Sequence, residues 1–197
     1  MPLLDHFNIL APFYEKFIQS SEPTTLFKLL EMPPDGILLD VGGGTGRISQ
    51  YFLGHAHRIV IADASLGMLN QARQRDLLMK SCSHAERLPF ANESIDRIMM
   101  VDALHHIHDQ SHAVDEMWRV LKTGGRMVIG EPDVRQPAIK MVALAEKLAL
   151  MRSHFLTPEE ILGLFRYPGA FTTMLLEGHD AWIKVEKRNI SSGQLRI

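Results

Sequence analysis

The sequence predicts an α/β fold of the three-layer, Rossmann-like kind, with a seven-stranded sheet that is mostly parallel and ends in an antiparallel hairpin. Three observations predict it. An apolar run meets a glycine cluster at residues 37–47, which is typical of the start of a βαβ unit. Strand-like runs then alternate with helical patterns over residues 57–130, as in parallel sheets covered on both faces. Two strand-like segments flank the turn at 178–180, which predicts a closing hairpin.

Composition narrows the class of protein. A chain of 197 residues with 46% hydrophobic and 22% charged residues is expected to be one globular domain. The net charge of −2 gives no reason to expect nucleic acid or an anionic membrane as a partner. Cys82 is the single cysteine, which excludes an internal disulfide and favours a reducing, cytoplasmic setting. The sequence shows no signal-peptide pattern and no apolar run of membrane-spanning length, so a soluble protein is expected.

The first part of the chain is expected to be helical. Apolar residues recur at helical spacing from Leu4 to Ile18, with an interruption at Pro12. A second helix is expected from Thr24 to Glu31, because the prolines and the Asp35-Gly36 turn that follow would stop it.

The middle of the chain supplies five expected strands. Each is a short run rich in apolar and β-branched residues, and each is bounded by turn residues. The expected strands are 37–41, 57–62, 77–81, 94–101 and 126–130; the expected helices are 66–75 and 113–121, with another helix start marked by Ile48, Tyr51 and Phe52.

The last part predicts two helices and the hairpin. An apolar face marks a helix over 138–150. Thr157 and Glu160 form a capping-box pattern for a short helix that ends at Leu164 or Phe165. The expected strands are 171–177 and 181–187. The single domain is thus expected in four parts: a helical lid segment 1–34, a core 35–132, a helical lid insertion 133–156, and a C-terminal helix and hairpin 157–187.

The glycine cluster is the first candidate for a binding site. Glycines let the backbone turn sharply and approach a ligand closely, and amide groups at a helix start favour negative groups. The dinucleotide fingerprint requires glycine at the sixth loop position, where this chain has Arg47. A nicotinamide-dependent oxidoreductase is therefore disfavoured.

The order Asp40-x-Gly42-x-Gly44-x-Gly46 resembles the first motif of the class I S-adenosylmethionine-dependent methyltransferases. In that family the loop wraps the methionine part of the cofactor. The resemblance implies that Asp40, Gly42, Gly43 and Gly44 bind S-adenosylmethionine.

Two later segments resemble the next family motifs. Asp63 and Ala64 end the second strand, with Met68 close behind, and an acid 23 residues after Asp40 is expected to bind ribose hydroxyls. Asp63 as a helix N-cap is the alternative, and Ser65 could cap instead.

The segment His84-Ala85-Glu86-Arg87-Leu88-Pro89-Phe90 resembles the family's Asp-Ala-x-x-Leu-Pro-Phe, which contacts adenine. His84 replaces the usual aspartate, and a neutral histidine offers one acceptor nitrogen in one tautomer only. The expected cofactor-binding residues therefore also include His84, Ala85 and Glu86, together with Val101 at the end of the fourth strand.

Three further segments match in order. Residues 94–98 and 118–126 resemble the fourth- and fifth-strand motifs, with Thr123 where the family has proline. Residues 7–14 resemble the N-terminal segment of small-molecule and quinone-type members (methyltransferase type 11), in which the tyrosine, here Tyr14, lies over the cofactor. Packing of Tyr14 within an amphipathic helix is the alternative.

A histidine-rich stretch, residues 102–109, follows the fourth strand, where open α/β sheets place their ligand crevice. Three interpretations stay open. In the first, the histidines shape the pocket. In the second, His105 or His106, with a pKa near 7, takes a proton from the acceptor. In the third, Asp102, His105 and His106 are metal ligands, although no metal is expected otherwise.

Methyl transfer requires few catalytic side chains, because the cofactor carries the activated methyl group and the enzyme mainly positions the acceptor. We therefore expect transfer to a small acceptor of apolar or aromatic character, which enters between the N-terminal segment and the 138–150 helix. A non-catalytic cofactor- or partner-binding protein on this fold is the alternative. Exposed lid surfaces leave room for a homodimer.

Overall fold

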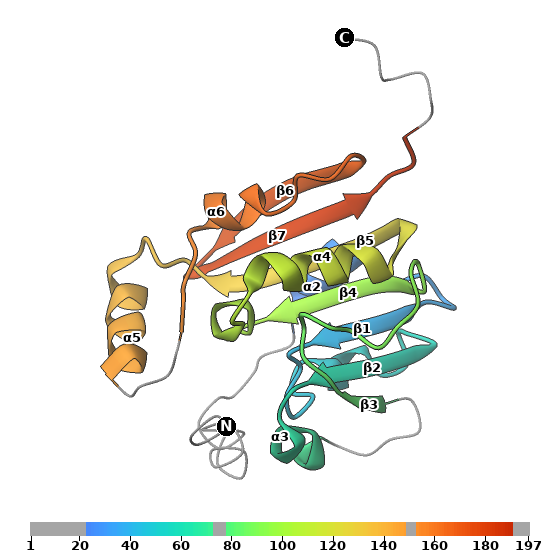
Figure 1. Cartoon of the computed structure of the whole chain (residues 1–197), viewed down its shortest axis with the longest axis horizontal. Coiled ribbons are helices and arrows are strands. Elements are labelled where there is room, and N and C mark those ends of the chain that lie inside the picture. Colours follow the sequence, from blue (N-terminus) through green and yellow to red (C-terminus); the bar gives the residue numbers. More distant parts are fainter. Residues whose placement is uncertain (1–22, 73–77, 149–152, 191–197) are drawn as a thin grey trace.

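A seven-stranded sheet forms the centre of the molecule (Figure 1). The computed structural model describes residues 23–72, 78–148 and 153–190. The strand order is β3-β2-β1-β4-β5-β7-β6, with the first five strands parallel and β7 antiparallel to both β5 and β6. The strands are β1 (Ile37–Val41), β2 (Arg58–Asp63), β3 (Leu78–Cys82), β4 (Ile95–Val101), β5 (Leu121–Pro132), β6 (Ala170–Glu177) and β7 (Asp180–Lys187). The predicted fold class is confirmed.

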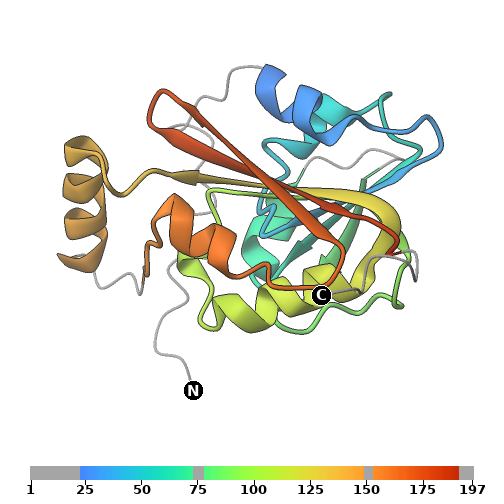
Figure 2. The same cartoon turned by 90° about the horizontal axis from the view of Figure 1, so that it is seen from above.

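Helices cover both faces of this sheet (Figures 1 and 2). The helical elements are α2 (Thr24–Leu30), η1 (Ser49–Phe52), α3 (Leu66–Gln71), η2 (Leu104–His106), α4 (Gln110–Val120), α5 (Pro137–Leu148) and α6 (Pro158–Gly163). Neighbouring residues of a strand face opposite layers: Leu38 packs with Leu26 and Phe52 on the α2 and η1 side, and Leu39 packs with Val114 and Ile161 on the α4 and α6 side. This alternation produces the three layers.

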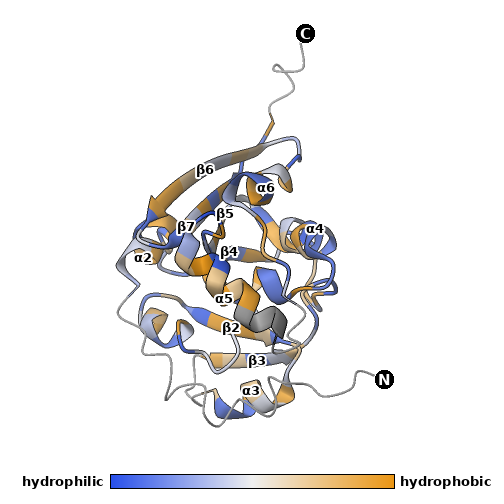
Figure 3. Ribbon diagram, turned by 90° about the vertical axis from the view of Figure 1, so that its left-hand side faces the viewer, coloured by the Kyte–Doolittle hydropathy of each residue, from blue (hydrophilic) through white to orange (hydrophobic). Residues whose placement is uncertain are grey.

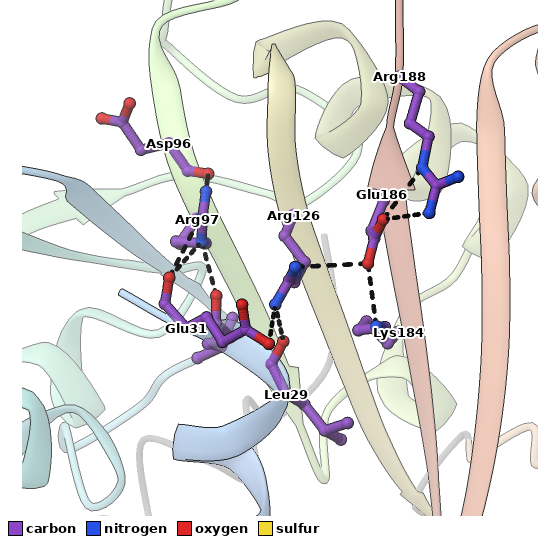
Figure 4. A network of polar contacts seen from close by, with 9 residues as sticks. Leu29, Glu31, Asp96, Arg97, Arg126, Lys184, Glu186 and Arg188 are labelled. Carbon is purple, nitrogen blue, oxygen red and sulfur yellow. Dashed lines mark hydrogen bonds and ion pairs between the residues drawn. The ribbon is translucent and has the colours of Figure 1, made fainter. Parts of the chain in front are cut away.

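Helix α2 is fastened to the sheet through its C-terminal carbonyl groups, which lack partners within the helix. The Arg97 side chain donates to the carbonyl oxygen of Leu30 at 2.6 Å, and Arg126 donates to that of Leu29 at 3.0 Å (Figure 4). Arg126 also pairs with Glu31 at 3.0 Å and with Glu186 of β7 at 3.4 Å. These contacts lie in the amino-terminal halves of β4 and β5, away from the ends where a ligand is expected.

One predicted helix is wrong in type. The segment after the glycine cluster forms only the four-residue 3₁₀ helix η1, because the chain turns again at Gly54, whose φ is +84°. Ser49, the first residue of η1, donates its hydroxyl to Asp40 at 2.7 Å. The expected helix dipole at the loop is therefore absent, and loop amides alone are available.

Other boundaries shift by a few residues. β5 begins at Leu121, so the predicted turn at 122–125 lies within the strand, next to a register shift between Ile95 and Arg97. α4 begins at Gln110, where Asp109 caps it by accepting from the backbone of His112. The capping box of Thr157 and Glu160 is confirmed.

The C-terminal hairpin continues the core sheet. Gly130 of β5 lies under the Trp182 ring of β7, and a Cβ at this glycine would meet the ring at 2.5 Å, so the ring can lie over this position only because the residue lacks a side chain. No helix in the described part of the chain is long and apolar enough to span a membrane. The predicted lid segment 1–22, including Tyr14, lies outside the described residues.

Candidate functional site

A cavity of about 520 Å³ opens at the carboxyl ends of β1, β2 and β4, a size typical of small-molecule sites. The strand order reverses between β1 and β4, which is where doubly wound sheets bind ligands. The lining residues come from the end of β1 and from four later segments, within residues 42–48, 62–68, 83–86 and 101–108. They are Asp40, Gly42, Gly43, Gly44, Thr45, Arg47, Ile48, Ala62, Asp63, Ala64, Ser65, Met68, Ser83, His84, Ala85, Glu86, Val101, Asp102, Ala103, His106, Ile107 and His108.

Backbone conformation and packing explain three glycines of the loop, Gly42, Gly43 and Gly44. Gly42 and Gly44 have φ values of +70° and +53°, a conformation that side chains disfavour. At Gly43 a Cβ would lie 2.5 Å from the Asp40 carboxyl. A Cβ at Gly44 would meet only the Asp63 carboxylate, at 3.9 Å. The loop therefore packs tightly against β1 at Gly43 and leaves space on the cavity side at Gly44.

Asp63 connects the two loops that form this side of the cavity. One carboxylate oxygen accepts from the Gly44 amide at 2.9 Å and the other from the Ser65 amide at 2.7 Å. Ser65, rather than Asp63, is the N-cap of α3, since its hydroxyl accepts from Met68 at 3.2 Å. Asp63 is thus placed at the cavity wall as predicted, with a structural contact to the glycine loop.

Asp40 is buried beneath the loop. Only 2% of the residue is exposed, and burial raises its pKa to about 7, against the lowering effect of the Ser49 hydrogen bond. The nearby Asp63 charge also raises it. Asp40 therefore supports the loop from below and is partly protonated near neutral pH.

Asp102 holds a strained position directly after β4. Its φ is +52°, which is unusual outside glycine and asparagine or aspartate. Its side chain pairs with Arg47 of the glycine loop at 3.0 Å, and burial raises its pKa in spite of Arg47. This ion pair joins the loop to the histidine-rich turn across the cavity.

Glu131 fixes the histidine-rich turn from β5. Its buried carboxylate accepts from the Ala103 and Leu104 amides at 2.9 and 2.7 Å and contacts Nδ1 of His105 at 2.5 Å. His105 is itself buried and stacks on Phe155, with ring centroids 4.2 Å apart. His105 thus lies behind the cavity wall and does not line it.

His106 does line the cavity. Burial, with a contribution from the neighbouring His105, lowers its pKa to about 3. Its Nδ1 lies 3.2 Å from the Ser153 hydroxyl. The expectation of a pKa near 7 is therefore wrong for His106, which is neutral at physiological pH and is a weak base.

The metal alternative gains no support. The Asp102 carboxylate points to Arg47 and the His105 ring to Glu131. Among residues 23–72, 78–148 and 153–190, no group of three histidine, cysteine or acidic side chains is arranged to hold a metal ion. Asp102, His105 and His106 are neighbours in sequence without forming a ligand set.

The structure brings together every predicted cofactor-binding residue that it describes. The residues Asp40, Gly42, Gly43, Gly44, Asp63, Ala64, Met68, His84, Ala85, Glu86 and Val101 all line the cavity. Sequence reasoning missed Arg47 as a lining residue and Glu131 as a support. An acid at the end of the fifth strand, next to the predicted crevice, was the available signal for Glu131.

Comparison with known proteins agrees with this geometry. Residues 39–129 match the methyltransferase domain family. The demethylmenaquinone methyltransferase of Mycobacterium sp. (strain KMS) is 33% identical over 153 residues, which cover 78% of this chain and 64% of that protein. The chain therefore spans a little under two thirds of the length of this curated relative.

Two solved structures share the fold. A chain in the complex between the Haloferax volcanii Trm112 methyltransferase activator and a methyltransferase has a TM-score of 0.81 at 16% identity, with 95% of this chain and 100% of that chain covered. The YcgJ protein of Bacillus subtilis has a TM-score of 0.70 at 23% identity, with 78% and 69% covered. The domain match, the curated relative and the sheet topology agree, and this chain is similar to the class I S-adenosylmethionine-dependent methyltransferases.

Proposed function

We propose that this chain binds S-adenosylmethionine in the cavity and transfers its methyl group to a small, apolar acceptor of the quinone type. The observation that carries the proposal is the convergence of three separate sequence motifs, at residues 40–46, 63–68 and 84–86, on one cavity of suitable size. The acceptor class is suggested by the name of the curated relative, a demethylmenaquinone methyltransferase.

The charge of the cavity suits a cationic cofactor. Four carboxyl groups, those of Asp40, Asp63, Glu86 and Asp102, line it together with the single guanidinium of Arg47. Asp40 is partly protonated near neutral pH and Asp102 pairs with Arg47, but the acidic groups still outnumber the guanidinium, which favours a sulfonium. We assign the glycine loop to the methionine part, Asp63 to the ribose, and the 84–86 segment to adenine.

The bound cofactor would supply the activated methyl group, and the chain would supply position and a dry environment. Glu131 and the Asp102–Arg47 pair hold the turn that carries His106 at the cavity wall. His106 is neutral and partly buried, so we assign it to shaping the acceptor end and to accepting a hydrogen bond, rather than to removing a proton.

We place the acceptor entrance beside α5. The parallel strands end on the side where α5 lies, and α5 projects beyond them (Figures 1 and 2). Met141, Val142 and Leu144 of α5 are exposed, as expected of a helix that meets an apolar molecule. The assignment of residues 133–156 as a lid insertion remains part of this proposal.

The test is transfer of a radiolabelled methyl group from S-adenosylmethionine to reduced demethylmenaquinone in detergent micelles, beside a panel of polar amino acids. We expect label in the quinone fraction only. Leu144→Glu should raise KM for the quinone and leave the affinity for S-adenosylmethionine unchanged. Met79→Glu, an exposed position on β3, is the matched control. Label in a polar amino acid would contradict the acceptor class, and cofactor binding without transfer to any acceptor would contradict the activity.

A further inference from the structure

The outer edge of the sheet at β6 is exposed and apolar. Phe171, Met174, Leu175 and Leu176 are each between 38% and 50% exposed. Figure 3 shows these hydrophobic colours along β6 at the margin of the molecule. Every residue from 171 to 177 is exposed, so both faces of this strand are open over most of its length.

Edge strands are normally protected by charge, shortness or a covering element, because their amide groups can pair with another strand. The opposite edge, β3, is short and carries the exposed Lys80. β6 has eight residues, and Glu177 at its end is its one charged residue. β6 therefore lacks the shortness and the charge that protect the opposite edge.

The amides that face outward can be identified. The Arg188 amide donates to the Gly169 carbonyl at 2.8 Å, so this is a hydrogen-bonded position of the β6–β7 ladder. Bonded and non-bonded positions alternate in an antiparallel pair. Phe171, Thr173 and Leu175 therefore bond to β7, and the even-numbered residues, Ala170, Thr172, Met174 and Leu176, direct their amide groups to the open edge.

We propose that β6 pairs antiparallel with β6 of a second copy of this chain, with Thr173 opposite the partner's Thr173. Only even-numbered residues can form bonded pairs across this edge, and this register opposes Thr172 to the partner's Met174 and Ala170 to the partner's Leu176. On the other face it opposes Phe171 to the partner's Leu175 at both ends. The strand is thus complementary to itself, as a two-fold interface requires.

Charge complementarity favours the same occupant. The Arg188 guanidinium lies over the Phe171 ring at 4.0 Å, on the face that carries Leu175 and Glu177. In the proposed register Glu177, which accepts from the Thr25 hydroxyl at 2.6 Å, lies opposite the partner's Gly169. The partner's Arg188 lies on the far side of that glycine and also pairs with Glu186 of its own chain. The register thus brings one Glu177 and one Arg188 near each other, across a glycine without a side chain, at each end of an otherwise uncharged strand pair. The dimer would join two sheets into one of fourteen strands and leave both cavities open.

The first experiment is sedimentation analysis of the full chain over a range of concentrations. We expect a monomer–dimer equilibrium. Thr173→Lys places two ammonium groups opposite each other on the two-fold axis, and should weaken the dimer at least about tenfold with the melting temperature of the monomer retained. A chain that stays monomeric throughout overturns the proposal.

Cysteine cross-linking tests the register. In a Cys82→Ser background, Thr173→Cys places two thiols at a non-bonded antiparallel pair, where Cα atoms lie about 4.5 Å apart and a disulfide is geometrically allowed. Thr172→Cys, one residue earlier, is the matched control, because its opposite residue is the partner's Met174. We expect rapid cross-linking of the 173 variant only. Equal or absent cross-linking of both variants overturns the register, and a monomer that instead binds an unrelated strand-forming peptide overturns the choice of a second copy.

Discussion

Asp40 supports the glycine loop, but its burial makes the stability of the folded chain depend on pH. Its carboxyl group is buried under Gly43 and bonded to Ser49, and its pKa is raised to about 7 from 3.8. A raised carboxyl pKa means that the folded chain binds a proton that the unfolded chain releases between these values. Stability from this group is therefore greatest at low pH and falls as the pH rises from about 4 to 7.

Asp40→Asn should remove this dependence. The amide oxygen can still accept from Ser49, so the fold is retained, and the variant should gain stability relative to the parent as the pH rises, by up to about 4 kcal/mol at pH 8. Urea unfolding of both chains without cofactor, at pH 5 and pH 8, measures the difference. Asp102 and Asp180 also have raised pKa values. Both residues are present in the parent and in the Asp40→Asn variant, so their effect cancels in the difference. A constant difference between the two chains at both pH values would contradict the raised pKa.

His106 gives the second residue-scale prediction. Since its pKa is lowered to about 3, no inflection from its titration should appear in kcat/KM between pH 5 and 8. His106→Gln keeps a hydrogen-bonding side chain and should reduce kcat by less than about tenfold, whereas loss of a general base costs about 10² to 10⁴. A loss in that larger range, with an acidic limb near pH 6.5 in the parent, would restore the proton-transfer role.

At the scale of elements, the turn after β4 depends on Glu131 of β5. Glu131→Ala would leave the buried Ala103 and Leu104 amides and the His105 ring without this acceptor, and should destabilise the chain by about 3 to 5 kcal/mol. Glu131→Gln should cost less, because an amide oxygen still accepts from the backbone. Glu159→Gln, an exposed acid paired with Arg135, is the control and should change stability by less than about 1 kcal/mol. Equal effects of the alanine variant and the control would show that the turn is held by other contacts.

Local patterns predicted most elements but not how they end. The five parallel strands and the hairpin are readable because their apolar runs are bounded by turns, and the capping box of Thr157 and Glu160 is a local signal. The segment after the glycine loop has a helical pattern, yet forms only η1, because the Ser49 contact to Asp40 and the turn at Gly54 are tertiary or backbone requirements. The extension of β5 to Leu121 depends on pairing with Ile95, which is distant in sequence.

The cavity residues were predictable where a motif carries them and not where only packing does. Gly42 to Gly44, Asp63 and His84 belong to recognisable segments, and all line the cavity. The pairing of Arg47 with Asp102, and the placement of His105 behind the wall, arise from contacts between segments 26 to 55 residues apart. The sequence did not distinguish His105 from His106, although one is buried against Glu131 and the other lines the cavity.

At the scale of the whole molecule, a ligand that binds the folded chain must stabilise it. S-adenosylmethionine at 100 times its dissociation constant should therefore add about 2.7 kcal/mol to the free energy of unfolding. The cavity joins β1, β2, β4 and the loops between them, so the gain should appear in the cooperative unfolding of the whole sheet rather than in one segment. NADH at the same concentration should leave the unfolding transition unchanged, and an equal shift with NADH would contradict a specific cofactor site.

The central claim is that the cavity binds S-adenosylmethionine, and calorimetric titration tests it most directly. The parent chain, Ala64→Phe and Ala91→Phe are titrated with S-adenosylmethionine and S-adenosylhomocysteine. Ala64 lines the cavity and Ala91 is an exposed alanine outside its lining. We predict micromolar binding of both ligands by the parent and by Ala91→Phe, and loss of at least about tenfold in Ala64→Phe. Absence of binding by the parent, or equal binding by both variants, would contradict the assignment of this cavity as the cofactor site.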